Sequence, residues 1–296
     1  MMFEDKLRLR LCGMVLGSVV SLGCTTETRG FDPPAKGELP SATPVDRAEM
    51  IYVAAGPFLM GHPDADPGMY GAAWKENEMP AHDVTLSEFW IDKTEVTVEA
   101  FAVFLSFAAG ERDYDPRMPI VRDGDLDYQA AEGLSHRPIN YVTYFAAADY
   151  CAWRGMRLPT EAQWERTAKG LDTRRWPWGE EGPNCTRANH YRGSSYCELG
   201  PVDVGSYSPA GDSLEGAQDM AGNVAEWVAD VYATYTADPV SDPTGPTEEW
   251  WHVVRGGGYN ESGAAIRTTA RWAADPSSGS PGIGFRCAIG AEGATP

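Results

Sequence analysis

Apolar residues in the first third of the chain come in short runs that have strand character. Residues 50–54 and 56–61 are apolar or β-branched and are bounded by Gly and Pro, so they predict two short strands about a turn. Residues 84–97 predict a further paired strand that leads into a helix.

Two segments that follow show helical patterns. A helix capped by Thr97 and ended by Gly110 would place four apolar residues on one face. These residues are Phe101, Phe104, Leu105 and Ala108. A second helix is predicted over residues 143–153, and Gly155 ends it because glycine readily takes a left-handed backbone conformation.

The segment at residues 157–165 predicts a third helix with a defined start. Thr160 as N-cap and Gln163 three residues later form a capping box, and Glu161 adds negative charge to the first turn. Beyond this point the chain shows few regular elements, and the whole sequence holds 32 glycines and 10 tryptophans. This composition predicts a compact domain of short strands and long ordered loops.

The N-terminus is typical of an export signal. Residues 1–23 combine a basic start, an apolar run and small residues, and the run is shorter than the roughly 20 residues of a transmembrane helix. Ser-Leu-Gly-Cys, ending at Cys24, resembles a bacterial lipoprotein box, in which the cysteine is lipidated; a cleaved signal or a weak anchor is the alternative. Residues 24–46 predict a flexible tether, and residues 47–296 a single globular domain. We therefore expect a protein of the bacterial cell envelope, in the periplasm or on the outer membrane, held to the membrane by its lipid.

The net charge of −19 argues against one class of partner. Removal of residues 1–23, which carry one net positive charge, makes it −20. A chain this acidic repels phosphate backbones, so no nucleic-acid partner is expected.

Four cysteines follow Cys24 in the sequence. They are Cys151, Cys185, Cys197 and Cys287. An even number in an oxidising compartment predicts two disulfides, for which three pairings exist. A reactive thiol is the competing interpretation, although the local sequence supplies no base or metal for it.

Several motifs together resemble one known family. They are Gly-x-Phe-x-Met-Gly at 56–61, Arg-Leu-Pro-Thr-Glu-Ala-Gln-Trp-Glu at 157–165, Gly-Asn-Val-Ala-Glu-Trp at 222–227, Arg-Gly-Gly-Gly-Tyr at 255–259 and Gly-Phe-Arg-Cys-Ala at 284–288. They are similar to motifs of formylglycine-generating enzymes, the sulfatase-modifying factor family, over about residues 50–290. The resemblance implies an α+β fold that is a variant of the C-type lectin fold, with short strands, few helices and long ordered loops. It also implies a disulfide between Cys151 and Cys287, which leaves Cys185 to pair with Cys197.

The chemistry of that family depends on two copper-binding cysteines shortly after the Gly-Gly-x-Tyr turn. Here no cysteine lies between Cys197 and Cys287. Counted from Tyr259, the two positions fall on Glu261 and Ile266; counted back from Cys287, they fall on glycines. Copper(I) requires soft thiolates, so copper is not expected.

The resemblance implies structural calcium as a cofactor. Asn223, Glu226 and the backbone carbonyl of Val224 match one family site, and Asn189 matches part of a second, weaker one. Calcium takes six to eight oxygen ligands, which such loops can supply. The alternative is that Asn223 and Glu226 cap a local helix or turn.

The surface equivalent to the family's active site would hold six residues of this chain. They are Tyr259, Asn260, Glu261, Arg267, Arg271 and Trp272. Glu261 and Arg271 could form an acid–base pair or a ligand clamp. The favoured alternative is structural: a surface salt bridge, with Arg271 buried against Trp272.

These observations leave two functions in competition. The first is a binding or assembly module, with an unknown protein or small molecule as its ligand, that has lost cysteine-dependent oxidation. The second is a periplasmic oxidoreductase resembling the pyoverdine-maturation members of the family. Whether the chain is an enzyme is left open, and formylglycine generation ranks third.

Overall fold

The computed structural model describes residues 47–62, 76–108, 113–124, 127–247 and 250–290. All these residues belong to one compact unit. The predicted signal and tether, Cys24 and the predicted helix end at Gly110 lie outside the described residues. Within them, no helix has the length and apolar character needed to cross a membrane.

Helices make up only a small part of the described residues, as predicted. The α-helices are α1 (Val98–Phe107), α2 (Tyr144–Trp153) and α3 (Glu161–Lys169), and the short 3-10 helices are η1 (Arg47–Glu49) and η3 (Glu76–Glu78). Each α-helix begins after a threonine whose hydroxyl accepts a backbone N–H of the first turn, and α3 has the complete capping box. The predicted helix starts are therefore confirmed. Ala108 is not on the buried face of α1 but is exposed at its C-cap, where the last turn ends.

The strands are short. They are β1 (Met50–Val53), β2 (Gly56–Met60), β3 (His82–Leu86), β4 (Phe89–Asp92), β5 (Ile120–Asp123), β6 (Asp127–Ala130), β7 (Ala225–Val231), β8 (Val240–Ser241), β9 (His252–Arg255), β10 (Arg271–Ala274), β11 (Ile283–Phe285) and β12 (Ala288–Gly290). They form four sheets in the orders β1-β4-β12, β10-β9-β7-β11, β2-β3-β8 and β5-β6.

The two strands predicted about a turn belong to different sheets. The predicted strands at 50–54 and 56–61 exist as β1 and β2, but they do not pair with each other. β1 pairs antiparallel with β4, and β2 pairs antiparallel with β3. The turn at Ala54–Ala55 therefore moves the chain from one sheet to the next instead of closing a hairpin.

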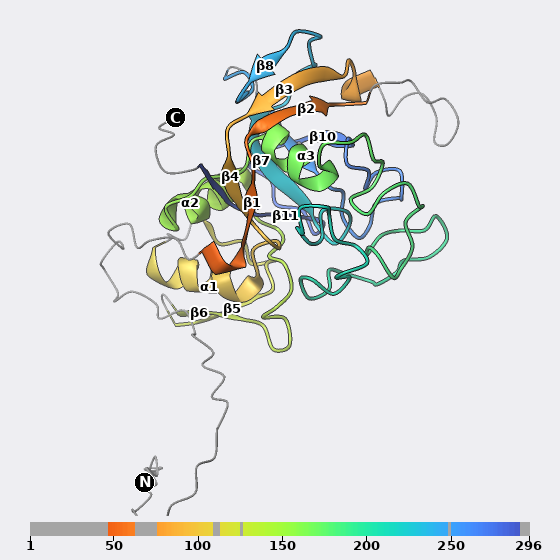
Figure 1. Cartoon of the computed structure of the whole chain (residues 1–296). Coiled ribbons are helices and arrows are strands. Elements are labelled where there is room, and N and C mark those ends of the chain that lie inside the picture. The colour runs from red at the N-terminus through yellow and green to blue at the C-terminus, as the bar shows by residue number, and fades with distance from the viewer. Residues whose placement is uncertain (1–46, 63–75, 109–112, 125–126, 248–249, 291–296) are drawn as a thin grey trace, which may run out of the picture. The chain divides into compact units, whose positions relative to one another are not determined.

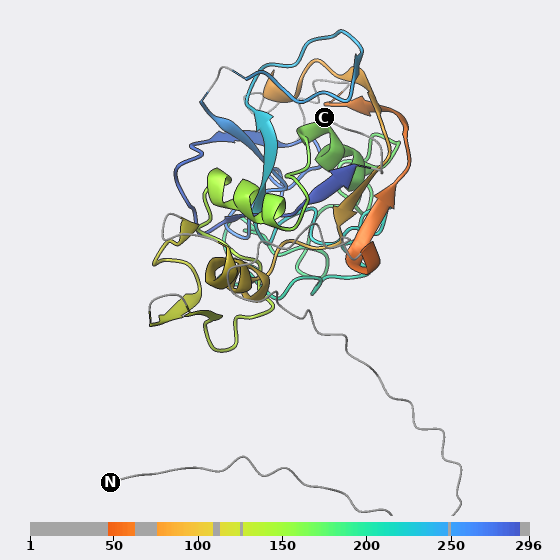
Figure 2. The same cartoon turned by 90° about the vertical axis from the view of Figure 1, so that its left-hand side faces the viewer.

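The four-stranded sheet positions the rest of the molecule. α2 and α3 both pack on β7, and α1 packs on α2 and β6 (Figures 1 and 2). Successive residues of β7 point to opposite faces: Trp227 joins the core with Phe101 and Phe285, whereas Val228 joins Trp164 on the α3 side. The sheet thus separates two apolar cores.

Both predicted disulfides are present. Cys151 of α2 is joined to Cys287, which lies between β11 and β12, and Cys185 is joined to Cys197 within a loop. Cys151 and Cys287 are fully buried in the core.

Candidate functional site

The Gly256–Tyr259 turn, which follows β9, is held by close backbone packing. Gly256 and Gly257 have φ values of +83° and +64°, where L side chains are strained. A Cβ on Gly256 would lie 3.0 Å from Trp164 Cζ2, and one on Gly257 would lie 2.8 Å from the Ala265 carbonyl oxygen. Glycine is therefore required at both positions by backbone conformation and by space.

This turn contacts the loop in which calcium was expected. The Tyr259 N–H donates to the Asn223 carbonyl at 2.9 Å, and the Gly222 N–H donates to the Gly256 carbonyl at 3.0 Å. Two segments singled out separately in the sequence therefore form one structural unit.

The side chain of Glu226 does not fit a calcium ligand in this arrangement. Arg286 donates to both of its carboxylate oxygens at 2.7 Å, and the indole N–H of Trp164 donates to Oε2 at 2.9 Å. Glu226 and Arg286 are both fully buried. The carboxylate thus belongs to a buried ion pair that links β7 to the segment between β11 and β12.

The side-chain oxygens of both asparagines expected to bind calcium accept hydrogen bonds from backbone N–H groups. Asn223 Oδ1 accepts the Val202 N–H at 2.9 Å, and Asn189 Oδ1 accepts the Glu198 N–H at 3.1 Å. Among the described residues, no group of three or more His, Cys, Asp or Glu could hold a metal ion. Calcium stays a prediction, and its ligand set would have to exclude Glu226.

Beside Asn223 lies a buried acidic pair that the sequence analysis missed. Asn223 Nδ2 donates to Glu95 Oε1 at 3.1 Å, while Glu95 Oε2 is buried without a hydrogen-bond partner. Burial and the neighbouring charge of Asp219 raise the pKa of Glu95 well above its ordinary value, and burial raises the pKa of Asp219. No sequence signal brings Glu95 and Asp219 together, because they lie far apart in the chain.

Tyrosines surround the turn on its exposed side. The ring centroids of Tyr191 and Tyr196 are 4.9 Å apart, and those of Tyr196 and Tyr259 are 6.5 Å apart. The Tyr191 N–H donates to the Glu261 carbonyl at 2.8 Å, which fixes the 185–197 loop beside the turn. Asn260 and Glu261 are exposed next to these rings. We call Tyr191, Tyr196 and Tyr259 the tyrosine surface.

The predicted relation between Glu261 and Arg271 is wrong. Arg271 forms a bidentate ion pair with Glu161, with both N···O distances at 2.7 Å, and its guanidinium lies over the rings of Tyr232 and Tyr235 rather than Trp272. Because Arg271 is buried on β10 against the start of α3, it is part of the scaffold.

Two other residues of the predicted surface are also part of the scaffold. Arg267 is buried and binds Glu78 through two hydrogen bonds. Trp272 is partly buried and packs against the main core. Of the six predicted residues, Tyr259 ends the turn and Asn260 and Glu261 follow it at the surface, whereas the other three belong to the scaffold.

The two positions matched to the family's cysteines have different environments. Glu261 is exposed, and partial desolvation by its neighbours raises its pKa. Ile266 is fully buried in a small apolar cluster with Trp176. Neither side chain is a soft ligand of the kind that copper(I) requires.

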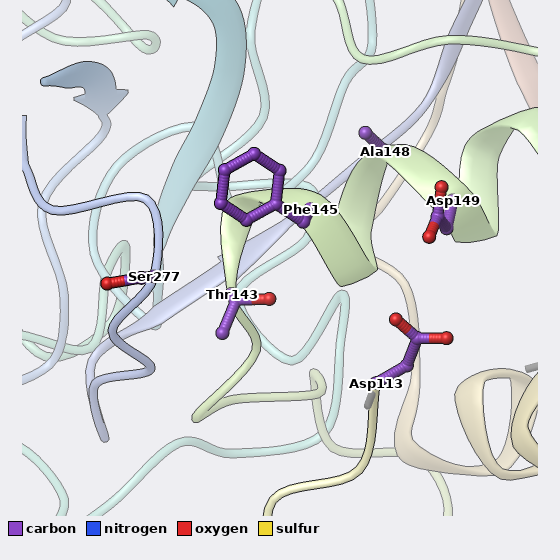
Figure 3. Close-up of a pocket in the computed structure, with 6 residues that line it drawn as sticks. All are labelled: Asp113, Thr143, Phe145, Ala148, Asp149 and Ser277. Atoms are coloured by element: carbon purple, nitrogen blue, oxygen red, sulfur yellow. The ribbon is translucent and has the colours of Figure 1, made fainter. Parts of the chain in front are cut away.

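A surface cavity is formed by other residues. It has a volume of about 470 Å³ and is lined by Asp113, Thr143, Phe145, Ala148, Asp149 and Ser277, as Figure 3 shows. Most of these residues come from the first turns of α2. The predicted site residues do not line it.

Comparison with known proteins identifies the family. Residues 36–291 match the Sulfatase-modifying factor enzyme 1-like domain, and the chain therefore belongs to this family. It is 32% identical over 299 residues to the formylglycine-generating enzyme of Streptomyces coelicolor, covering 86% of this chain and 93% of that enzyme. It is 31% identical over 289 residues to the inactive C-alpha-formylglycine-generating enzyme 2 of Mus musculus, covering 82% of this chain and 86% of that protein.

The chain is also similar to part of a longer protein and to two solved structures. The serine/threonine-protein kinase pkn1 of Chlamydia pneumoniae is 31% identical over 265 residues; the match covers 86% of this chain but only 40% of the kinase. The structure of PvdO from Pseudomonas aeruginosa has a TM-score of 0.64 and 30% identity, covering 82% of this chain and 94% of PvdO. Treponema denticola variable protein 1 has a TM-score of 0.60 and 23% identity over 82% of this chain and 95% of its own. The predicted fold class, a family variant of the C-type lectin fold, is confirmed.

Proposed function

We propose that this chain is an exported, lipid-anchored protein of the bacterial cell envelope and acts as a binding or assembly module. The observation that carries this proposal is the tyrosine surface, which stands beside the turn where formylglycine-generating relatives hold their copper-binding thiols. Tyr196 is 43% exposed, and Glu261 and Asn260 border it. Tyrosine gives a large, rigid contact area together with a polar hydroxyl, which suits binding of a protein or small molecule.

The state of the cysteines supports the same proposal. All four that follow Cys24 are joined in disulfides. The positions matched to the copper ligands hold a carboxylate and a buried hydrocarbon. A relative named as an inactive formylglycine-generating enzyme gives a precedent for this scaffold without that activity.

Site-specific crosslinking in bacteria tests the binding role. A photoreactive phenylalanine analogue is placed at Tyr196 and, as a matched control, at Tyr52, which is 44% exposed on β1. We expect an adduct from position 196, and none from position 52, that disappears when Tyr191 is changed to Ala. An adduct at both positions, or one that survives Tyr191→Ala, would contradict a specific surface.

Lipid anchoring is tested separately on the full chain. We expect mass spectrometry of the N-terminal peptide to find diacylglycerol on Cys24, and Cys24→Ala to move the protein from the membrane fraction to the soluble fraction. An unmodified Cys24 in a protein that still fractionates with the membrane would refute lipidation.

The second candidate is a periplasmic oxidoreductase, favoured by the 30% identity to PvdO and by one feature of the site. Glu261 is an exposed carboxyl with a raised pKa, next to Tyr259, and such a group can transfer protons. This candidate predicts oxygen consumption with a thiol or phenol substrate that falls in Glu261→Gln. Absence of turnover with copper, iron or no added metal would leave the binding role as the explanation.

A further inference from the structure

The two disulfides differ sharply in accessibility. Cys151 and Cys287 are fully buried in the main core. Cys185, in contrast, is exposed, and Cys197 is half-buried. An external thiolate must reach a sulfur atom along the S–S axis to displace the other, so only the loop disulfide is accessible without unfolding.

A hydrogen-bond donor lies beside the second sulfur of the loop disulfide. His190 Nδ1 is 3.2 Å from the Ala188 carbonyl oxygen and 3.6 Å from Cys197 Sγ. A carbonyl oxygen only accepts hydrogen bonds, so Nδ1 carries a hydrogen, and this single N–H is shared between the Ala188 oxygen and the more distant Cys197 Sγ. His190 is 3% exposed, and its ring is therefore held in place against the sulfur.

We propose that the Cys185–Cys197 disulfide is a site of thiol–disulfide exchange with an external thiol, in which Cys185 is attacked and Cys197 leaves. The incoming thiolate forms a bond to Cys185 Sγ, and the Cys185–Cys197 bond breaks with its electron pair on Cys197 Sγ. The His190 N–H, which the Ala188 carbonyl shares in the disulfide form, turns its hydrogen bond towards that leaving thiolate because a negatively charged sulfur is the stronger acceptor, and this favours its departure. A second external thiolate then attacks the external sulfur of the mixed disulfide and releases Cys185. Two external thiols are thereby oxidised to a disulfide, and the protein disulfide is reduced to two thiols.

The reaction has a structural consequence for the neighbouring surface. The disulfide closes the loop that carries Tyr191 and Tyr196, and this loop is tied to the turn through the Tyr191 N–H and the Glu261 carbonyl. Reduction would release one of the constraints on the tyrosine surface. This consequence rests on the proposed binding role, whereas the exchange itself is measured without any ligand, so the two can fail separately.

Thiol titration of the oxidised full chain tests the exchange. The protein is incubated with glutathione or with dithiothreitol, quenched with an alkylating reagent and mapped by peptide mass spectrometry, while near-ultraviolet circular dichroism reports the fold. We expect Cys185 and Cys197 to be labelled at least tenfold faster than Cys151 and Cys287, with the fold retained. In the glutathione arm, the trapped adduct should lie on Cys185.

The two arms distinguish the source of the thiol. Reaction with both reagents indicates a site open to small thiols, and reaction with dithiothreitol alone indicates a dithiol partner. Equal labelling of both disulfides, labelling only after unfolding, or an adduct on Cys197 would overturn the proposal.

A variant tests the part played by His190. His190→Phe keeps a ring of similar size but removes the N–H, and we expect reduction of the loop disulfide to slow about tenfold. His136→Phe is the control, because it makes the same change at an exposed histidine outside this loop, and it should leave the rate unchanged. An unchanged rate in His190→Phe would refute the role of the histidine, and unchanged labelling of Cys151 and Cys287 shows that this variant is folded.

Discussion

Asp230 on β7 gives a prediction whose sign and size follow from its surroundings. Its side chain is 5% exposed, and Oδ2 accepts the Glu161 N–H at 2.7 Å at the start of α3. Burial first, and then the charge of Glu161, raise the pKa of Asp230 from 3.8 to about 7. A shift of about three units corresponds to about 4 kcal/mol between the two protonation states.

The folded state therefore holds a proton that the unfolded state loses near pH 4. Because the folded pKa is raised, stability falls as the pH rises from about 4 to about 7, by up to about 1.4 kcal/mol per pH unit, and then levels off. Asp230→Asn has no proton to lose, and its amide oxygen can still accept the Glu161 N–H. We expect the variant to gain stability relative to the parent by up to about 4 kcal/mol between pH 4 and pH 7.

Urea unfolding of the parent and Asp230→Asn at pH 4, 5, 6, 7 and 8 measures this difference. Asp275→Asn is the control, because hydrogen bonds from Ser277 lower the pKa of Asp275, so that it is ionised in both states above pH 5. Above pH 5, the stability of Asp275→Asn should change with pH in the same way as that of the parent. If the stability of Asp230→Asn also followed that of the parent at every pH, Asp230 would not be a buried carboxyl that is protonated in the folded state.

Three further changes are expected to follow from the structure. Arg286→Met leaves Glu226 charged and buried, and should lower the free energy of unfolding in urea by about 3–5 kcal/mol. Arg117→Ala, which breaks an exposed ion pair, should lower it far less, and equal losses would contradict a buried ion pair. Thr160→Ala removes the N-cap of α3 and should cost about 1 kcal/mol, whereas an unchanged midpoint would show that the cap is not needed. If the predicted calcium site exists, millimolar calcium raises the melting temperature and a chelator lowers it; no shift with either rules the site out.

Local features of this fold were predictable, because their causes lie within a few residues of each other. Thr97, Thr143 and Thr160 each cap a helix through a backbone N–H three residues later. The glycine turn was likewise recognisable, since Gly256 and Gly257 adopt positive φ. The disulfide pairing came from the family resemblance, because spacing alone left three possibilities.

The partners of buried charges could not be predicted in the same way. The sequence shows Arg271 but does not show that it meets Glu161, because that contact depends on where β10 lies relative to α3. The same holds for Glu95 and Asp219, which the folded loops bring together. The sequence likewise does not show that β4 is the neighbour of β1, because this pairing joins segments that are not adjacent in the chain.

The pairing of the last strands also determines when the chain can fold. β12 pairs with β4, β11 pairs with β7, and Arg286 between them neutralises Glu226. A nascent chain that lacks these residues has an unpaired edge on two sheets and an uncompensated buried carboxylate. The domain therefore cannot fold completely until β11 and β12 have been synthesised, and loss of these two strands would destabilise both sheets and the core between them.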